Sequence, residues 1–217
     1  KFDKELENRG LRFVRYADDC NIFVKSEMSA NRVMKSVTSW LERKLFLKVS
    51  ATKTKVVRPP ESKFLGFTYL QRNGVWKCKP SNQSKMKLYD KCRKELVRRI
   101  GIARPIAVTF KRINQIVVGW INYYRIGVMK YFVDVFGQWL RHKIRVIILK
   151  QWKKPKRIYI NLQKLNKKLR CLFTDEQIFS VANSRLGLYR QACGHVVNFL
   201  LSPRILAIKK KDRPGLV

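Results

Sequence analysis

The feature that most limits what this chain can fold into is a long stretch with almost no acidic residues. Asp134 is the one acid between residues 96 and 174. The whole chain of 217 residues carries 49 Lys and Arg against 14 Asp and Glu, a formal charge of +35. Its 46% of hydrophobic and 12% of aromatic residues exclude a disordered basic tail. A folded form with this charge repels itself unless a polyanion binds, and the aromatic content favours nucleic acid over a bare membrane surface.

Several other classes of protein are excluded by the composition. No apolar run approaches the roughly 18 residues that a membrane span needs, and the N-terminus lacks the features of a secretion signal. Five cysteines without a Cys-x-x-Cys pair and two histidines encode neither a disulfide framework nor a zinc site. We therefore expect reduced thiols, no membrane segment, and a location in the bacterial cytoplasm or in an organelle rather than secretion. The first residue is Lys1, so we expect the chain to begin inside a longer protein.

The first 80 residues have the patterns of a mixed domain. Alternation and spacing predict the end of a helix at residues 5–9, a hairpin of strands 11–16 and 21–25, and a helix at 26–45. Three further strands are predicted at 54–58, 63–70 and 75–79. Gly10 is placed to end the first helix, and Ser26 or Ser29 to cap the second. Asn73-Gly74 predicts a tight turn between the last two strands.

The rest of the chain has helical periodicity. Helices are expected at residues 81–101, 109–124, 131–151 and 161–170, with a strand or a helix at 195–201. Gly101 is expected to end the first of these helices, and Thr109 to cap the second. Trp120 and Tyr124 fall on the apolar face of that second helix, so we expect both rings in the core rather than stacked on bases.

Two adjacent carboxylates, Asp18 and Asp19, lie where two apolar β-rich runs turn. Like charges in a half-buried setting are costly unless a cation lies between them or one is protonated. Mg²⁺ prefers oxygen ligands and meets this need. The competing interpretation is an ordinary Asp-Asp β-turn, which an isolated pair of this kind favours.

The neighbouring motifs decide between these interpretations. Tyr16-Ala17-Asp18-Asp19 resembles motif C of reverse transcriptases, Lys53-Thr54-Lys55 resembles motif D, and Phe64-Leu65-Gly66-Phe67 resembles motif E. Residues 119–124 and 150–153 are similar to the maturase or thumb region of group II intron-encoded proteins. The resemblance extends from Lys1 to about Lys154. Four short motifs in the right order on a chain of this charge are specific to that family.

The resemblance implies an α+β fold. Residues 1–80 would be the C-terminal half of a polymerase palm, with antiparallel hairpins and a helix, and residues 81–155 a helical thumb or maturase domain. Residues 156–217 would form a small basic segment. A DNA-binding role for that segment rests on position and on the charges of Lys209, Lys210, Lys211 and Arg213.

The family also implies an activity, RNA-directed DNA synthesis by two-metal nucleotidyl transfer. Asp18 and Asp19 would bind Mg²⁺, with Mn²⁺ as an alternative, and Lys53 would stabilise the leaving pyrophosphate. Phe64, Leu65, Gly66 and Phe67 would grip the primer. Thr52 stands where the family often has Glu before the motif D lysine. The fingers and the first catalytic aspartate of the family lie upstream of motif C, so we expect the chain alone to be inactive and to need that missing half as a partner.

The basic helices predict phosphate binding, because a solvated face normally mixes both signs of charge. The resemblance implies as partners structured intron RNA, an RNA template with its DNA primer, and dNTP. The residues predicted to contact nucleic acid are Arg98, Arg99, Lys111, Arg112, Asn122, Tyr123, Arg125, Lys130, Arg141, Lys143, Arg145, Lys150, Lys153 and Lys154. The sequence leaves two functions open. The chain is part of a reverse transcriptase/maturase that serves splicing and mobility, or it is a non-catalytic, maturase-type splicing cofactor that binds RNA.

Overall fold

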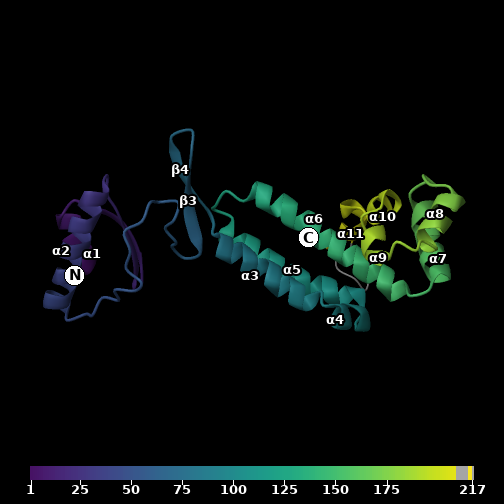
Figure 1. Cartoon of the computed structure of the whole chain (residues 1–217), viewed down its shortest axis with the longest axis horizontal. Coiled ribbons are helices and arrows are strands. Elements are labelled where there is room, and N and C mark those ends of the chain that lie inside the picture. The colour runs from purple at the N-terminus through teal and green to yellow at the C-terminus, as the bar shows by residue number, and fades with distance from the viewer. Residues whose placement is uncertain (209–214, 217) are drawn as a thin grey trace. The chain divides into compact units, whose positions relative to one another are not determined.

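The computed structural model describes residues 1–208 and 215–216, and its chain divides into two compact units, Lys1–Ser81 and Asn82–Val217. We call them unit 1 and unit 2. Unit 1 combines helices with strands, and the described part of unit 2 contains helices (Figure 1). The basic end predicted at Lys209–Lys211 and Arg213 lies outside the described residues.

Unit 1 begins with a helix, a hairpin and a second helix. Helix α1 (Phe2–Asn8) is followed by Gly10, which takes a positive φ of 66° as expected after a helix end. Strands β1 (Arg12–Tyr16) and β2 (Asp19–Phe23) pair antiparallel. Helix α2 (Glu27–Leu45) starts at Ser26, whose side chain accepts a hydrogen bond from the backbone N–H of Ser29. The predicted hairpin and capped helix are therefore confirmed.

The second half of unit 1 holds one more hairpin. Strands β3 (Phe67–Arg72) and β4 (Val75–Pro80) pair antiparallel around Asn73-Gly74, where both residues take a positive φ, as a type I′ turn requires. The strand predicted at residues 54–58 is wrong. That run joins no strand and leads into Pro59-Pro60, which lack the N–H groups that a ladder needs.

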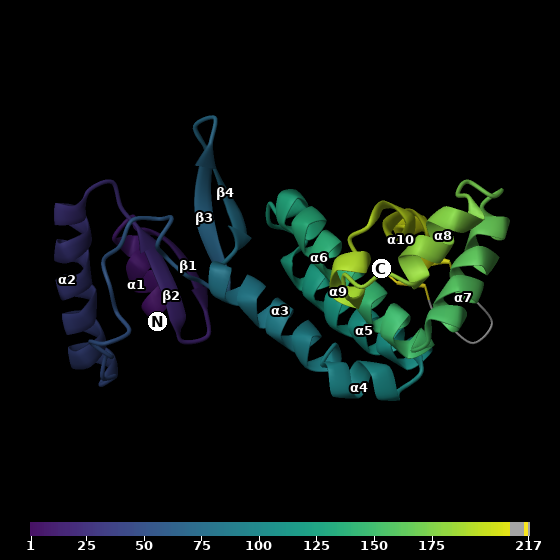
Figure 2. The ribbon, with the colours of Figure 1, turned by 45° about the vertical axis from the view of Figure 1, so that its right-hand side comes forward.

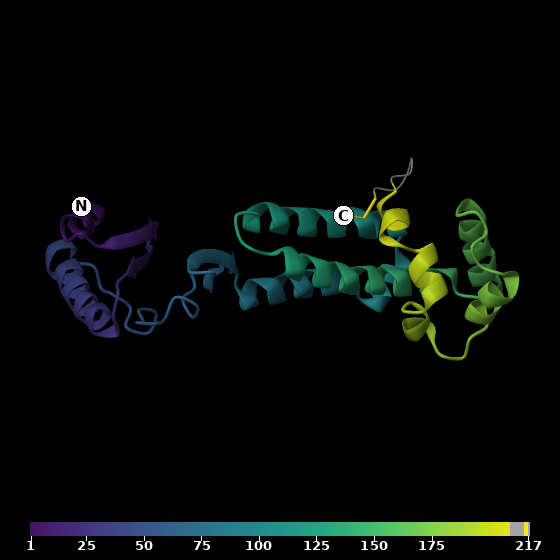
Figure 3. The ribbon, with the colours of Figure 1, turned by 90° about the horizontal axis from the view of Figure 1, so that it is seen from above.

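Unit 2 is helical, and Figure 2 shows its long helices and the smaller ones packed beside them. Its first part contains α3 (Asn82–Glu95), α4 (Arg98–Ala103), α5 (Ile106–Tyr124) and α6 (Lys130–Trp152). Seen from above, α5 and α6 run alongside each other (Figure 3).

Two predicted helix boundaries in this part are wrong. Gly101 does not end a helix but lies inside α4, where a Cβ would come within 2.7 Å of the Ile147 side chain, so it permits close packing of α4 on α6. Thr109 does not cap α5, which begins three residues earlier after Pro105. Instead Thr109 is buried, and its hydroxyl accepts a hydrogen bond from Arg104.

The end of unit 2 has more helices than the sequence predicted. They are α7 (Pro155–Lys168), α8 (Asp175–Ala182), α9 (Leu188–Gln191), α10 (His195–Leu200) and α11 (Pro203–Ala207). The element expected at 195–201 is thus a helix. One apolar core runs from Leu88 in α3 to Leu206 in α11. The boundary predicted at 155 stays a prediction, and α7 packs with α6 in the same unit. Among the described residues no helix has the length and apolarity to cross a membrane.

Candidate catalytic and nucleic-acid-binding sites

The Asp pair lies at the end of the first hairpin. Tyr16 pairs with Asp19, so Ala17 and Asp18 form a two-residue turn, and Ala17 takes a positive φ of 52°. Asp19 is the first residue of β2 rather than part of the loop. Both carboxylates are exposed, so the half-buried setting expected from the apolar flanks is wrong.

The two faces of this hairpin have different neighbours. Side chains alternate along a strand, so Asn21 and Phe23 share the face of Asp19. The Asn21 amide donates a hydrogen bond to the Ser62 hydroxyl over 3.1 Å, and the Phe23 ring meets Tyr69 of β3 edge-on at 5.7 Å. Asp19 therefore lies on the face that meets the segment around motif E.

The other face is held to α1 by Arg15. Its guanidinium binds the Asp3 carboxylate with two hydrogen bonds of 2.5 and 2.8 Å, and it donates a third of 2.6 Å to the carbonyl of Ala17 in the turn. This planar group thus links the turn that carries Asp18 to a helix. Sequence reasoning missed Arg15, and its place two residues before the turn was the available signal.

Asp3 is not free to join the carboxylate pair. Hydrogen bonds from Arg15 hold the pKa of Asp3 below its usual value, and they raise the pKa of the Arg15 guanidinium. In the part of the chain that the structure describes, no group of three His, Cys, Asp or Glu side chains could hold a metal ion. The donor chemistry of Asp18 and Asp19 suits a hard cation, but this pair provides only part of a coordination shell.

Lys53 is exposed in the irregular segment between α2 and β3. Its backbone N–H and that of Thr54 both donate to the carbonyl of Ser50, over 3.2 and 3.0 Å, so the lysine sits on a local turn. Within the described residues neither a hydrogen bond nor an ion pair joins Lys53 to Asp18 or Asp19.

The predicted primer-grip segment is a tight turn before β3, not a strand interior. Phe64 and Phe67 exchange backbone hydrogen bonds of 3.0 and 2.8 Å around Leu65 and Gly66, which both take a positive φ. The carbonyl of Gly66 accepts a 2.8 Å hydrogen bond from the backbone of Ser81. This hydrogen bond ties the turn to the end of β4.

In unit 2 most of the predicted nucleic-acid contacts are accessible. The exposed ones are Arg98, Arg99, Lys111, Arg112, Asn122, Tyr123, Arg125, Lys130, Lys153 and Lys154. Three more are half-buried, namely Arg141, Lys143 and Lys150. Arg112 also lies 3.6 Å from the carboxylate of Glu95, which pairs more closely with Arg104 at 2.6 Å.

Arg145 is the exception, and its prediction as a phosphate contact is wrong. Its side chain is only 6% exposed. The Nε atom donates to the carbonyl of Leu201 over 2.9 Å, and an Nη atom lies 3.4 Å from the carbonyl of Asn198. Burial lowers the pKa of this guanidinium, and the nearby charge of Arg141 lowers it further. Arg145 therefore connects α6 to α10 and is hidden from nucleic acid.

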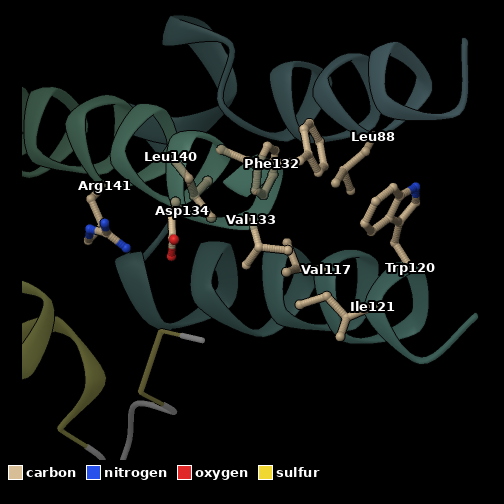
Figure 4. A pocket seen from close by; sticks show the side chains of 11 residues that line it. Leu88, Val117, Trp120, Ile121, Phe132, Val133, Asp134, Leu140 and Arg141 are labelled. Atoms are coloured by element: carbon tan, nitrogen blue, oxygen red, sulfur yellow. The ribbon is translucent and has the colours of Figure 1, made fainter. Parts of the chain in front are cut away.

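A cavity of about 150 Å³ lies between the first half of α6 and the helices α3 and α5 (Figure 4). Its lining is mostly apolar, with Trp120 at one end and Asp134 beside Arg141 at the other. The rings of Trp120 and Tyr124 are 4.5 Å apart, and Trp120 packs against Phe132. Both belong to the core as expected, while Tyr123 is 54% exposed.

Comparison with protein families accounts for both units. Residues 1–69 match the family model of the reverse transcriptase (RNA-dependent DNA polymerase), and this range contains Asp18, Asp19 and Lys53. Residues 85–173 match the model of the group II intron, maturase-specific domain, which covers most of α3 through α7. No curated protein matches the chain significantly. With a reverse transcriptase match followed by a maturase-specific one, the chain belongs to the group II intron-encoded reverse transcriptases/maturases.

Proposed function

We propose that this chain is part of an RNA-directed DNA polymerase that also binds intron RNA for splicing and mobility. The observation that carries the catalytic part is the placement of the Asp pair. Asp18 lies on an exposed two-residue turn, and Asp19 lies on the hairpin face that meets the motif E segment. Exposed aspartates are also common in ordinary turns, and the reverse transcriptase match over residues 1–69 is what favours the catalytic role.

In this mechanism three parts of unit 1 have separate roles. Asp18 and Asp19 would hold divalent ions, Mg²⁺ or alternatively Mn²⁺, which when bound acidify the primer 3′-hydroxyl and neutralise the leaving pyrophosphate. Lys53, which lies on an exposed turn, would stabilise the negative charge of the pyrophosphate that leaves the dNTP. The turn at Phe64, Leu65, Gly66 and Phe67 would hold the primer end, because its backbone is fixed by reciprocal hydrogen bonds.

The polymerase would need a further palm and fingers half. Two carboxylates do not complete a metal site of this kind, and the hairpin β1–β2 is a sheet of only two strands, which is marginally stable alone. Val14 and Tyr16 of β1 are 46% and 65% exposed, so apolar surface is available for such a partner. The chain by itself would therefore bind nucleic acid without extending a primer.

Unit 2 would bind structured intron RNA and the template–primer duplex. Its exposed cations outnumber its acids, and the Glu95 carboxylate already forms ion pairs with Arg104 and Arg112. If about six to ten phosphates are contacted, affinity falls roughly 10³–10⁵-fold between about 50 and 200 mM salt.

Substitution of the Asp pair tests the catalytic proposal. In a longer protein that joins this chain to a fingers region and a further palm aspartate, Asp18→Asn and Asp19→Asn should each reduce primer extension by at least about 10²-fold, since a preorganised charge is lost. RNA binding by filter retention should change less than about twofold, because the cations proposed to bind phosphate lie in unit 2 rather than at the Asp pair. Glu42→Gln, on the exposed side of α2, is the matched control.

Two results would contradict the proposal. Extension that survives both Asp substitutions would remove the catalytic role. Full splicing activity together with no extension by the unsubstituted longer protein would favour the non-catalytic splicing cofactor instead.

A further inference from the structure

We propose that Arg98, Lys143 and Lys150 form one preorganised site for the phosphate backbone of RNA on unit 2, flanked by Tyr189 as a base-stacking ring. This inference rests on the proposed RNA binding and assigns it a location. The three cations come from α4 and α6, and the ring comes from α9, so the site is made by three helices.

Helix spacing places the two lysines together. Positions three and four apart share a face, so Lys143, Ile147 and Lys150 lie in a row along α6. Helix α4 packs on this row, because Gly101 leaves room for the Ile147 side chain. The Gln151 amide fixes the contact with two 2.9 Å hydrogen bonds, to the carbonyls of Gly101 and Arg104. This anchoring holds α4, and Arg98 at its first position, against the α6 row.

Tyr189 orients the other end of the site. The Nζ atom of Lys143 lies 5.0 Å from the centre of the Tyr189 ring, within the range of a cation–π contact. His142 lies edge-on to the same ring at 4.5 Å, and its Nε2 atom is 3.0 Å from the Tyr189 carbonyl. These contacts fix the ring although it is 58% exposed, so one part of it is accessible to a base.

The charges of this cluster are not neutralised inside the protein. Burial lowers the pKa of Lys150, and the nearby charges of Arg98 and Lys143 lower it further. Among the described residues, the ion pairs of unit 2 join Arg93 to Asp90 and Glu95 to Arg104 and Arg112, and none involves the three cations. Holding like charges together costs free energy, and a bound anion between them would relieve it.

RNA is the occupant that these features favour. Successive phosphates along one strand can each contact a separate point charge such as a lysine ammonium group, and an adjacent exposed aromatic ring suits a base of the same strand. An acidic peptide would use the cations but not the ring. The maturase-specific match, residues 85–173, contains all three cations, whereas Tyr189 lies beyond it.

Lysine footprinting of the unsubstituted chain is the first test. Trace acetylation followed by mass spectrometry is performed on the 217-residue chain, free and with a 40-nucleotide hairpin RNA. Lys143 and Lys150 should be protected at least about fivefold, and Lys35 and Lys44 on α2, exposed in unit 1, should be protected much less. Anionic lipid vesicles are the comparison probe.

Substitution supplies the second test. Lys143→Gln with Lys150→Gln should weaken hairpin binding by about tenfold or more at 0.1 M salt and should flatten the salt slope, since each lost phosphate contact removes roughly 0.7–0.9 from it. The double variant Lys35→Gln with Lys44→Gln removes the same charge and should have a much smaller effect. Tyr189→Leu should weaken binding to a single-stranded RNA while leaving the salt slope unchanged.

The outcomes separate the two proposals. A chain that does not bind the hairpin contradicts the proposed function as a whole. Binding without protection of Lys143 and Lys150, or equal losses in the two double variants, overturns only this site. Protection by vesicles but not by RNA overturns it as well.

Discussion

The two units of this chain differ in what holds them together. In unit 1 the buried apolar residues are Leu6, Val37 and Pro80, whereas unit 2 has one continuous core through α3, α5, α6 and the helices that follow. Unit 1 also has smaller contacts, such as the Phe23–Tyr69 ring pair and the 2.7 Å hydrogen bond from the buried Thr68 hydroxyl to the Pro60 carbonyl. Unit 2 is therefore expected to fold alone, while unit 1 exposes the apolar side chains of Val14 and Tyr16 near its Asp pair.

Arginine shows the same difference at the level of one side chain. In unit 1 the exposed Arg15 is matched by a carboxylate, and in unit 2 the buried Arg145 is matched by backbone carbonyls. An exposed ion pair adds little stability and chiefly orients groups, whereas a buried donor that loses its partners is costly. Arg15 thus orients the turn of unit 1 and adds little stability, whereas Arg145 stabilises unit 2 from its interior.

The largest expected effect is on the core of unit 2. Phe110 is fully buried in α5, so Phe110→Ala should lower the free energy of unfolding of unit 2 by about 3–5 kcal/mol. Val118→Ala, at a position 40% exposed on the same helix, should cost about 0.5 kcal/mol. Urea denaturation followed by circular dichroism measures both. Equal effects of the two substitutions would contradict a tightly packed core in unit 2, because Val118 lies outside that core.

A smaller loss is expected at Arg145. Removal of this side chain leaves the Leu201 carbonyl without its buried donor, so Arg145→Ala should cost about 1–3 kcal/mol of stability. RNA affinity, measured at a temperature where the variant is folded, should stay within about twofold. A tenfold loss of RNA affinity in the folded variant would restore Arg145 as a phosphate contact.

Much of the fold could be predicted from local patterns. Asn73-Gly74 specifies a type I′ turn by backbone sterics alone, and Ser26 specifies a helix start by its side chain. Both predictions were correct because the cause lies within a few residues. The strand at 54–58 was wrong because a strand needs a partner, which the run itself does not encode.

The candidate site follows the same rule. Tyr16-Ala17-Asp18-Asp19 was identified from four consecutive residues, and the structure places the pair on the predicted hairpin. The burial of Arg145 and the close approach of α4 to α6 depend on helices that are far apart in the sequence. Gly101 shows where local patterns fail. Glycine often ends a helix, but Gly101 lies inside α4, where it leaves room for the Ile147 side chain.

The smallest expected effect concerns the ion pair between Arg15 and Asp3. It tests whether a polar contact orients the Asp-bearing turn of unit 1. The pKa of Asp3 is lowered in the folded chain, so the link contributes above the unfolded pKa, near 4, and is lost as pH falls through the lower folded value. In NMR titrations the Ala17 and Asp18 amide signals should shift with Asp3 in that acid range, because Arg15 also holds the Ala17 carbonyl. Asp3→Asn should remove this step and broaden the turn signals while the spectrum of unit 2 is unchanged. Glu7→Gln, on the same helix, should leave the titration intact. A turn that does not respond to Asp3 would show that the hairpin holds its Asp pair without help from α1.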